Sequence, residues 1–139
     1  MTSPSEQYLS LITQDIIPKV DAATVSALFD QLPPIKPSTL TGSWSGGFFD
    51  TGHPVGAQLV EINWVGKEFN SLDEVDPVIV EREGKRVREM VFRGVLSATM
   101  IYDDRPVFDH FRYVNEQVLA GVMEGKAVEG GDFDFYLKR

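Results

Sequence analysis

Apolar residues recur at helical spacing in the first part of the chain and alternate with polar residues in the last part. Residues 5–16 and 21–32 each place their apolar positions on one helical face, so the pattern predicts two amphipathic helices. Pro18 and Pro33 would end them, because proline has no backbone N–H for the helical hydrogen-bond ladder. We therefore expect residues 1–39 to form a helical arm.

Apolar and polar residues alternate with a period of two from residue 78 onward. Such alternation, broken by short turns, predicts consecutive antiparallel strands. The longest run, residues 90–114, is expected to form one hairpin that turns at residues 103–105. A sheet of sequential strands avoids open edges by curling into a barrel, which we expect over residues 40–139. The expected strands are 78–82, 86–89, 90–102, 107–114, 117–124 and 133–137.

The helical and alternating regions meet at a glycine-rich stretch, residues 40–49, in which Gly42, Gly46 and Gly47 surround Trp44. Glycine permits close approach of neighbouring backbone. A tryptophan side chain is large enough to fill one end of a small barrel. We therefore expect Trp44 to be buried where the helical arm joins the sheet.

A third, short helix is expected over residues 54–63, where Pro54 suits the first turn and the apolar residues share one face. Residues 64–70 indicate an exposed turn and a short strand. With 139 residues the chain suits a single domain spanning 1–139. The expected fold class is mainly β (α+β), with N-terminal helices followed by an antiparallel barrel of about six to eight strands.

The composition excludes several function classes. Acidic residues number 21 and basic residues 13, which gives a net charge of −8. Nucleic acids and anionic membranes both attract basic surfaces, so we expect neither as a partner. The absence of cysteine excludes thiol catalysis and thiolate metal sites. The first residues lack a signal peptide pattern and no apolar run is long enough to span a bilayer, so we expect a soluble, cytoplasmic protein.

Several motifs occur together along the chain: Gly42-Ser-Trp-Ser-Gly, Trp64-Val-Gly-Lys-Glu-Phe, Phe92-Arg-Gly-Val-Leu-Ser-Ala-Thr-Met and Asp109-His-Phe-Arg. As a set they resemble the GXWXG-domain family of bacteria and fungi, together with the segment of unknown function that usually accompanies it. The resemblance covers residues 30–139. It implies a lipocalin-like β-barrel with no established activity, in which the two named segments make one structural unit.

A second resemblance is to nitrobindin-type and fatty-acid-binding barrels, whose signature has the form GxWxGxG. Gly42, Trp44 and Gly46 match this signature, whereas position 48 is Phe48. Nitrobindins bind haem through a histidine near their C-terminus, and the last histidine of this chain, His110, lies well before its end. We therefore do not expect haem, or any other cofactor.

His110 and Arg112 are candidate ligand-binding residues in the predicted strand 107–114. Alternation places them on one face and Asp109 and Phe111 on the other, and it leaves open which face lines the barrel. We favour the face of His110 and Arg112. If that face lines the barrel, the two side chains lie about 7 Å apart and can bind a carboxylate or a phosphate. If not, they form a solvated outer face.

Trp64 and Lys67 are expected at the barrel mouth, where an aromatic ring beside a cation suits ligand binding. The alternative is a packing tryptophan and a surface charge. Phe92 and Met100 are expected to contact an apolar ligand, with Trp44 at one end of the barrel. The two histidines, His53 and His110, lack a ligand-spaced motif, so no metal site is expected.

The leading functional hypothesis is binding of a small apolar or amphipathic molecule, such as a lipid or a fatty-acid-like metabolite, in the barrel. One alternative is an isomerase- or hydrolase-type enzyme in which His110, Arg112 or Lys67 performs acid–base chemistry in the same cup. Another is a structural or interaction module, including a homodimer formed through an exposed strand.

Overall fold

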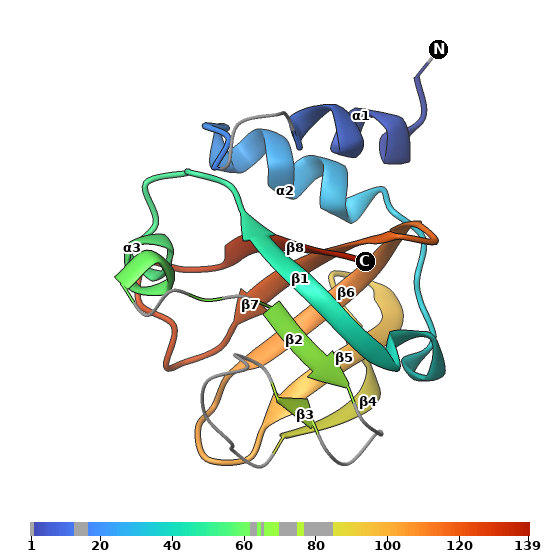
Figure 1. Cartoon of the computed structure of the whole chain (residues 1–139), viewed down its shortest axis with the longest axis vertical. Helices are drawn as coiled ribbons and strands as arrows, with labels where there is room; N and C mark the ends of the chain where they lie inside the picture. Colours follow the sequence, from blue (N-terminus) through green and yellow to red (C-terminus); the bar gives the residue numbers. More distant parts are fainter. Residues whose placement is uncertain (1, 13–16, 62–63, 65, 70–74, 77–84) are drawn as a thin grey trace.

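The described part of the chain folds into a curled antiparallel sheet of eight strands that carries helices on its outer face and at one end (Figure 1). The computed structural model describes residues 2–12, 17–61, 64, 66–69, 75–76 and 85–139. The helices are α1 (Pro4–Leu11), α2 (Ala22–Asp30), the 3-10 helix η1 (Pro37–Leu40) and α3 (Pro54–Glu61). The strands are β1 (Gly42–Phe48), β2 (Gly66–Phe69), β3 (Val75–Asp76), β4 (Lys85–Phe92), β5 (Val95–Tyr102), β6 (Phe108–Asn115), β7 (Val118–Glu124) and β8 (Phe133–Lys138).

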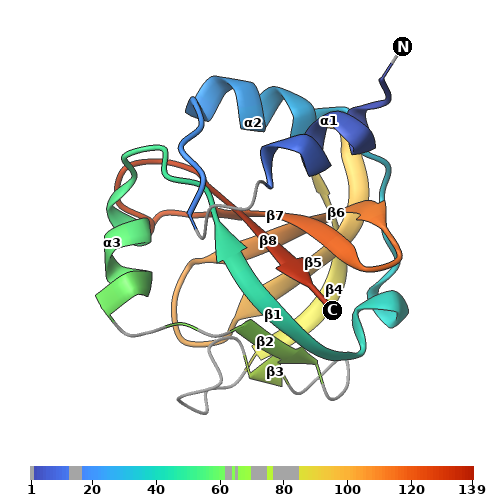
Figure 2. The same ribbon diagram turned by 45° about the horizontal axis from the view of Figure 1, so that its top comes forward.

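The sheet curls until its two ends approach each other. Its strand order is β3-β2-β1-β8-β7-β6-β5-β4, so β1 pairs with β8 and joins the two halves of the sequence. Cα atoms of β3 and β4, which lie at opposite ends of this order, come within 8 Å of one another. The result is the mainly β, barrel-like fold with N-terminal helices that the sequence predicts (Figure 2).

The helices begin where the sequence predicts them. The Ser3 side chain caps α1 by accepting a hydrogen bond from the Glu6 backbone N–H at 3.1 Å, and Pro4 occupies the first turn. α2 starts after Asp21 and ends at Asp30, two residues short of the predicted end. Residues 13–16 and 62–63, included in the predicted helices, lie outside the described residues. α1 and α2 pack side by side across one face of the sheet (Figure 2).

The predicted hairpin that turns at residues 103–105 forms only from residue 95 onward, because the strand expected over residues 90–102 is interrupted. β5 pairs with β6 in the register Thr99↔His110. β4 ends and β5 begins at a two-residue turn, Arg93-Gly94, in which both residues have positive φ, 51° and 80°. This is the backbone that a tight hairpin turn requires, and glycine adopts it without a steric cost. The predicted strand 78–82 lies outside the described residues.

Apolar side chains fill two layers, one inside the curled sheet and one between its outer face and the helices. The inner layer includes Trp44, 2% exposed as predicted, and Phe111. The outer layer joins Tyr8 and Phe29 of the helices to sheet residues such as Tyr136. Strands β6, β7 and β8 therefore bury both of their faces. No helix in the described ranges is both long and apolar enough to cross a bilayer.

Candidate functional site

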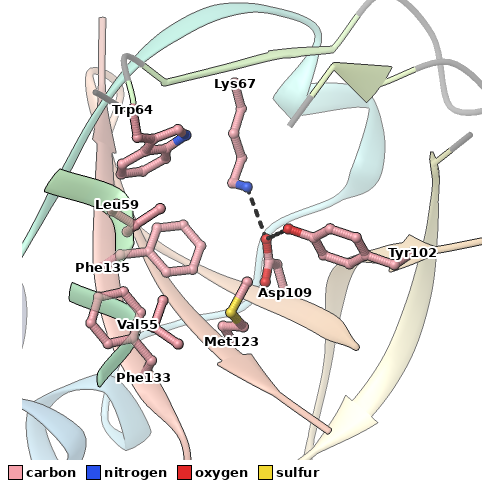
Figure 3. A pocket seen from close by; sticks show the side chains of 9 residues that line it. All are labelled: Val55, Leu59, Trp64, Lys67, Tyr102, Asp109, Met123, Phe133 and Phe135. Carbon is pink, nitrogen blue, oxygen red and sulfur yellow. Dashed lines mark hydrogen bonds and ion pairs between the residues drawn. The ribbon is translucent and has the colours of Figure 1, made fainter. Parts of the chain in front are cut away.

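A cavity opens inside the curled sheet between α3 and the ends of several strands (Figure 3). We call it the cup. Its volume is about 40 Å³, and it opens to solvent at its mouth. Aromatic and aliphatic side chains make most of its wall, and two charged groups lie at its floor. The cup is lined by Val55, Leu59, Trp64, Lys67, Tyr102, Asp109, Met123, Phe133 and Phe135.

The strand register aligns three of the lining residues across neighbouring strands. Asp109 of β6 lies opposite Met123 of β7, which in turn lies opposite Phe133 of β8. Residues paired across antiparallel strands point to the same face. These three side chains therefore form a row across the inside of the sheet, with the carboxylate at one end.

Gly46, the last glycine of the Gly42-Ser-Trp-Ser-Gly motif, makes room for one wall of the cup. A Cβ atom at this position would collide with the six-membered ring of Trp64. Gly66 plays a similar part, because a Cβ there would collide with the backbone carbonyl oxygen of Trp44. The two glycines let β2 approach β1 closely, and the approach brings Trp64 and Lys67 to the lining of the cavity.

Lys67 and Asp109 form a buried ion pair at the floor of the cup. The Lys67 Nζ to Asp109 Oδ2 distance is 2.9 Å, and their side chains are 4% and 0% exposed. The ammonium also lies 5.6 Å from the Trp64 ring centroid and 5.3 Å from that of Phe135. Both rings present their negative faces to a cation at this range. The pair is therefore held by electrostatics within an otherwise apolar space.

Tyr102 adds a neutral donor to the same carboxylate. Its hydroxyl donates to Asp109 Oδ2 over a long 3.4 Å bond. Burial of the phenol, and then the negative charge of Asp109, raise the pKa of Tyr102 well above 10. Tyr102 therefore keeps its proton at neutral pH. The other carboxylate oxygen, Asp109 Oδ1, is buried and has no hydrogen-bond partner among the described residues.

The comparisons with known proteins agree with this architecture. Residues 27–84 match the model of the GXWXG protein family, and residues 84–139 match a domain of unknown function (DUF4334). A crystal structure of a protein from Thermomonospora curvata superposes with a TM-score of 0.85, at 36% identity over 97% of each chain. The chain belongs to the GXWXG protein family. No curated protein matches it.

The two matched segments of this GXWXG protein build one sheet. Strands β1 to β3 come from the first segment and β4 to β8 from the second, and β1 pairs with β8. The cup also draws on both, since Lys67 belongs to the first and Asp109 to the second. The site therefore exists only when the two segments fold together.

Of the residues proposed from the sequence, Trp64 and Lys67 line the cup. Trp44 and Met100 are buried in the inner core without lining it. The Trp44 indole N–H donates to the Leu40 carbonyl at 2.9 Å. Both residues therefore support the barrel rather than form the wall of this cavity.

The prediction that His110 and Arg112 line the barrel is wrong. Asp109 and Phe111 face inward, and the opposite face of β6 packs beneath the helices. That outer face is not solvated either, because His110 and Arg112 are 2% and 1% exposed. Phe92 also lies outside the barrel, where its ring stacks on His110 with centroids 3.8 Å apart.

Arg112 holds the end of α2. Its Nη1 donates to the backbone carbonyls of Phe29, Asp30 and Leu32 at 3.0–3.2 Å, and Nη2 donates to that of Phe92 at 3.2 Å. The last carbonyls of a helix have no partner within the helix. A guanidinium with several fixed donors satisfies them, so Arg112 is a structural residue.

His110 links Thr99 and Glu124 in a hydrogen-bonded chain of three side chains. Its Nδ1 lies 3.0 Å from the Thr99 hydroxyl and its Nε2 lies 2.8 Å from the Glu124 carboxylate. Burial lowers the pKa of His110 more than its contact with Glu124 raises it. Thr99 is fully buried. None of the three side chains lines the cup, so this hydrogen-bonded chain does not reach the cavity.

His53 caps the start of α3, as its position before Pro54 suggests. Its Nδ1 accepts a hydrogen bond from the Val55 backbone N–H at 3.1 Å, and its Nε2 lies 2.7 Å from the Gly131 carbonyl oxygen. Nε2 must therefore carry the proton and donate to that carbonyl. Within the part of the chain that the structure describes, no three acidic or histidine side chains are grouped to hold a metal ion.

Sequence reasoning missed Asp109 and Tyr102 as parts of the site. The alternation of β6 carried a usable signal for Asp109, since its face of the strand also holds Phe111 and Tyr113. A carboxylate on an aromatic face needs either a buried cation or a bound proton, and for Asp109 Lys67 supplies the cation. Tyr102 ends its strand immediately before a turn, and nothing in the sequence connects it with Asp109.

A second buried carboxylate, Asp134 of β8, leads to a prediction about pH. Burial, with a smaller contribution from Asp132 and Asp30 and against the effect of Arg93, raises the pKa of Asp134 from 3.8 to about 7. Between these values the unfolded chain is ionised while the folded chain keeps the proton. The contribution of Asp134 to stability must therefore fall as pH rises from about 4 to about 7.

Substituting Asp134→Asn removes this ionisation. We expect the free energy of unfolding to rise by about 2–4 kcal/mol at pH 8, and to change little near pH 4. Urea unfolding of both proteins at the two pH values measures the difference. Asp104→Asn, at an exposed turn, is the control and should show no such pH dependence. An Asp134→Asn effect of equal size at both pH values would contradict the raised pKa.

Proposed function

We propose that the cup binds a small apolar or amphipathic molecule. The observation that carries the proposal is the combination of an apolar wall with the buried Lys67–Asp109 pair at its floor. Ligand pockets typically combine mostly apolar walls with a few placed polar groups that fix orientation. A buried ion pair is weak support for stability by itself, since an apolar pair of similar volume often serves as well. A role in orienting a bound ligand would explain why the protein has this ion pair.

The dimensions favour a short ligand. The volume of the cup, about 40 Å³, lies well below the range for ligand pockets, roughly 300–1,000 Å³. A small head group fits at the floor, and a compact apolar body must extend into the open mouth beside α3. A long acyl chain requires side chains such as Leu59 or Met123 to move, so within the lipid-like class we favour short or cyclic molecules.

An enzymatic role in the same cup is the second candidate. Asp109 and Tyr102 lie within reach of each other and could exchange protons with a bound substrate. The raised pKa of Tyr102 makes it a weak acid, and Lys67 already occupies Asp109 Oδ2. Binding therefore explains the geometry better than catalysis.

The cytoplasm remains the compartment that we propose, from the lack of cysteine.

Methyl NMR of methionine tests the proposal at the site itself. The chain has four methionines, of which Met123 lines the cup and Met90 lies on β4 away from it. With 13C-methyl methionine labelling and a panel of small cyclic compounds, we expect saturable shifts of the Met123 signal and none at Met90. Native mass spectrometry of the same protein reports any co-purified ligand and the oligomeric mass.

Two substitutions on α3 serve as a matched pair. Val55→Phe fills the cup, because Val55 lines it, and should abolish the Met123 shifts. Val60→Phe adds the same ring at a position that is 59% exposed and should leave them unchanged. If no compound moves the Met123 signal, or if the shifts survive in Val55→Phe, the cup is not a binding site.

A further inference from the structure

The floor of the cup carries an acceptor that lacks a donor. Oδ2 of Asp109 is occupied by Lys67 at 2.9 Å and Tyr102 at 3.4 Å, whereas Oδ1 is buried without a partner among the described residues. Buried carboxylate oxygens are costly to leave unpaired, since desolvation is not repaid. Asp109 is one of the residues that line the cavity, so a small shift of the side chains around Oδ1 lets a bound molecule supply the missing donor (Figure 3).

The charges at the floor set a second condition. Lys67 and Asp109 neutralise each other in a space walled by aromatic and aliphatic groups. An anionic head group would bring a third charge beside Asp109, and a cationic head group would bring one beside Lys67. Burying a further charge without its own partner is strongly unfavourable. The head group that suits this floor is uncharged.

An alcohol suits this position better than water, because most of the wall of the cup is apolar. Met123, Phe133 and Val55, which also line the cup, have no side-chain group that forms a strong hydrogen bond. A hydroxyl group attached to an apolar body donates to the carboxylate and leaves the body in contact with these side chains.

We propose that the cup selects neutral alcohols, whose hydroxyl group donates a hydrogen bond to Oδ1 of Asp109. This inference rests on the proposed function and specifies its ligand class. It replaces the fatty-acid head group expected from the sequence, since a carboxylate cannot donate when ionised. A hydroxyl group both donates and accepts, so it suits a floor made of a carboxylate and an ammonium.

The test uses four probes that share one five-membered ring: cyclopentanol, cyclopentanone, cyclopentanecarboxylate and methylcyclopentane. Titration of the Met123 methyl signal gives a dissociation constant for each. We expect cyclopentanol to bind at least about 10-fold more tightly than cyclopentanone, the ratio that one hydrogen bond to a charged group supplies. Cyclopentanecarboxylate should bind more weakly than cyclopentanol as well.

Variants separate the head-group contact from the apolar cup. Asp109→Asn should remove most of the alcohol preference. Because this change leaves Lys67 without its carboxylate partner and can unfold the protein, the double variant Lys67→Met/Asp109→Leu provides an apolar floor. It should bind methylcyclopentane and show no alcohol preference. Asp134→Asn, which alters a buried carboxylate outside the cup, should keep the full preference.

The outcomes distinguish the two proposals. Binding of several probes with the ketone or the carboxylate equal to or tighter than the alcohol overturns the alcohol assignment and leaves the cup a binding site. An alcohol preference that survives in Lys67→Met/Asp109→Leu also overturns it. If none of the four probes shifts the Met123 signal, the proposed function fails, and the alcohol assignment fails with it.

Discussion

Replacing Arg112 with alanine is expected to lower the free energy of unfolding by about 4 kcal/mol or more, because several buried acceptors lose their donor at once. The guanidinium donates to the carbonyls of Phe29, Asp30, Leu32 and Phe92. It also lies over the Phe29 ring at 4.7 Å, a contact that alanine cannot replace. Chemical denaturation of the wild-type and variant proteins measures the loss.

Two further variants test whether the stability lost in Arg112→Ala comes from the hydrogen bonds of the buried guanidinium. Arg112→Lys retains the charge but not the planar fork, so it should recover only part of the lost stability. Arg105→Ala removes an exposed arginine that pairs with Asp104 at a turn, and should cost less than about 1 kcal/mol. If Arg112→Ala costs no more than Arg105→Ala, the end of α2 does not depend on this side chain.

Substituting Lys67→Met is expected to cost about 3–5 kcal/mol, because it leaves the Asp109 carboxylate buried without its cation. Asp109→Leu should cost a similar amount for the converse reason. The double variant Lys67→Met/Asp109→Leu should recover most of the loss, since apolar groups of similar volume often replace a buried pair without penalty. Urea unfolding of the four proteins gives the coupling free energy between the two side chains.

The result of this cycle also bears on why the pair exists. Near-wild-type stability in the double variant would mean that folding does not need the ion pair, which leaves orientation of a ligand as its role. Losses that simply add in the double variant would mean that Lys67 and Asp109 stabilise the sheet independently. Such additivity would contradict a coupled ion pair at the floor of the cup.

The elements of this fold could be predicted because each has a local cause. The helices follow apolar spacing, with Ser3 capping α1 and Pro54 starting α3, and the strands follow alternation. The turn at Arg93-Gly94 was missed because strand-like apolar residues lie directly on both sides of it, so the two-residue break was taken as part of one strand. Local propensity thus recovers the elements but not every boundary.

The site was harder to predict because strand β6 is buried on both faces. Alternation distinguishes the inside of a sheet from the outside only where one face is solvated. In this protein α1 and α2 cover the outer face, so His110 and Arg112 are as buried as Asp109. The pairing of Lys67 with Asp109 depends on the curl of the whole sheet, which brings β2 and β6 together across the barrel.

The residues of the GXWXG motif have identifiable packing roles in this structure. Trp44 fills the inner core, and Gly46 leaves the space that the Trp64 ring occupies. Trp64 in turn contacts the ammonium of Lys67 and the ring of Phe135. Packing at the motif is therefore coupled to the wall of the cup through direct contacts.

A crystal structure of the protein soaked with cyclopentanol tests the binding of alcohols in the cup most directly. We expect the alcohol in the cup, with its oxygen about 2.5–3.0 Å from Oδ1 of Asp109 and its ring against Leu59 and Phe133. A cup that stays empty or filled with water at saturating alcohol, or an alcohol bound with its hydroxyl group turned away from Asp109, would contradict this expectation.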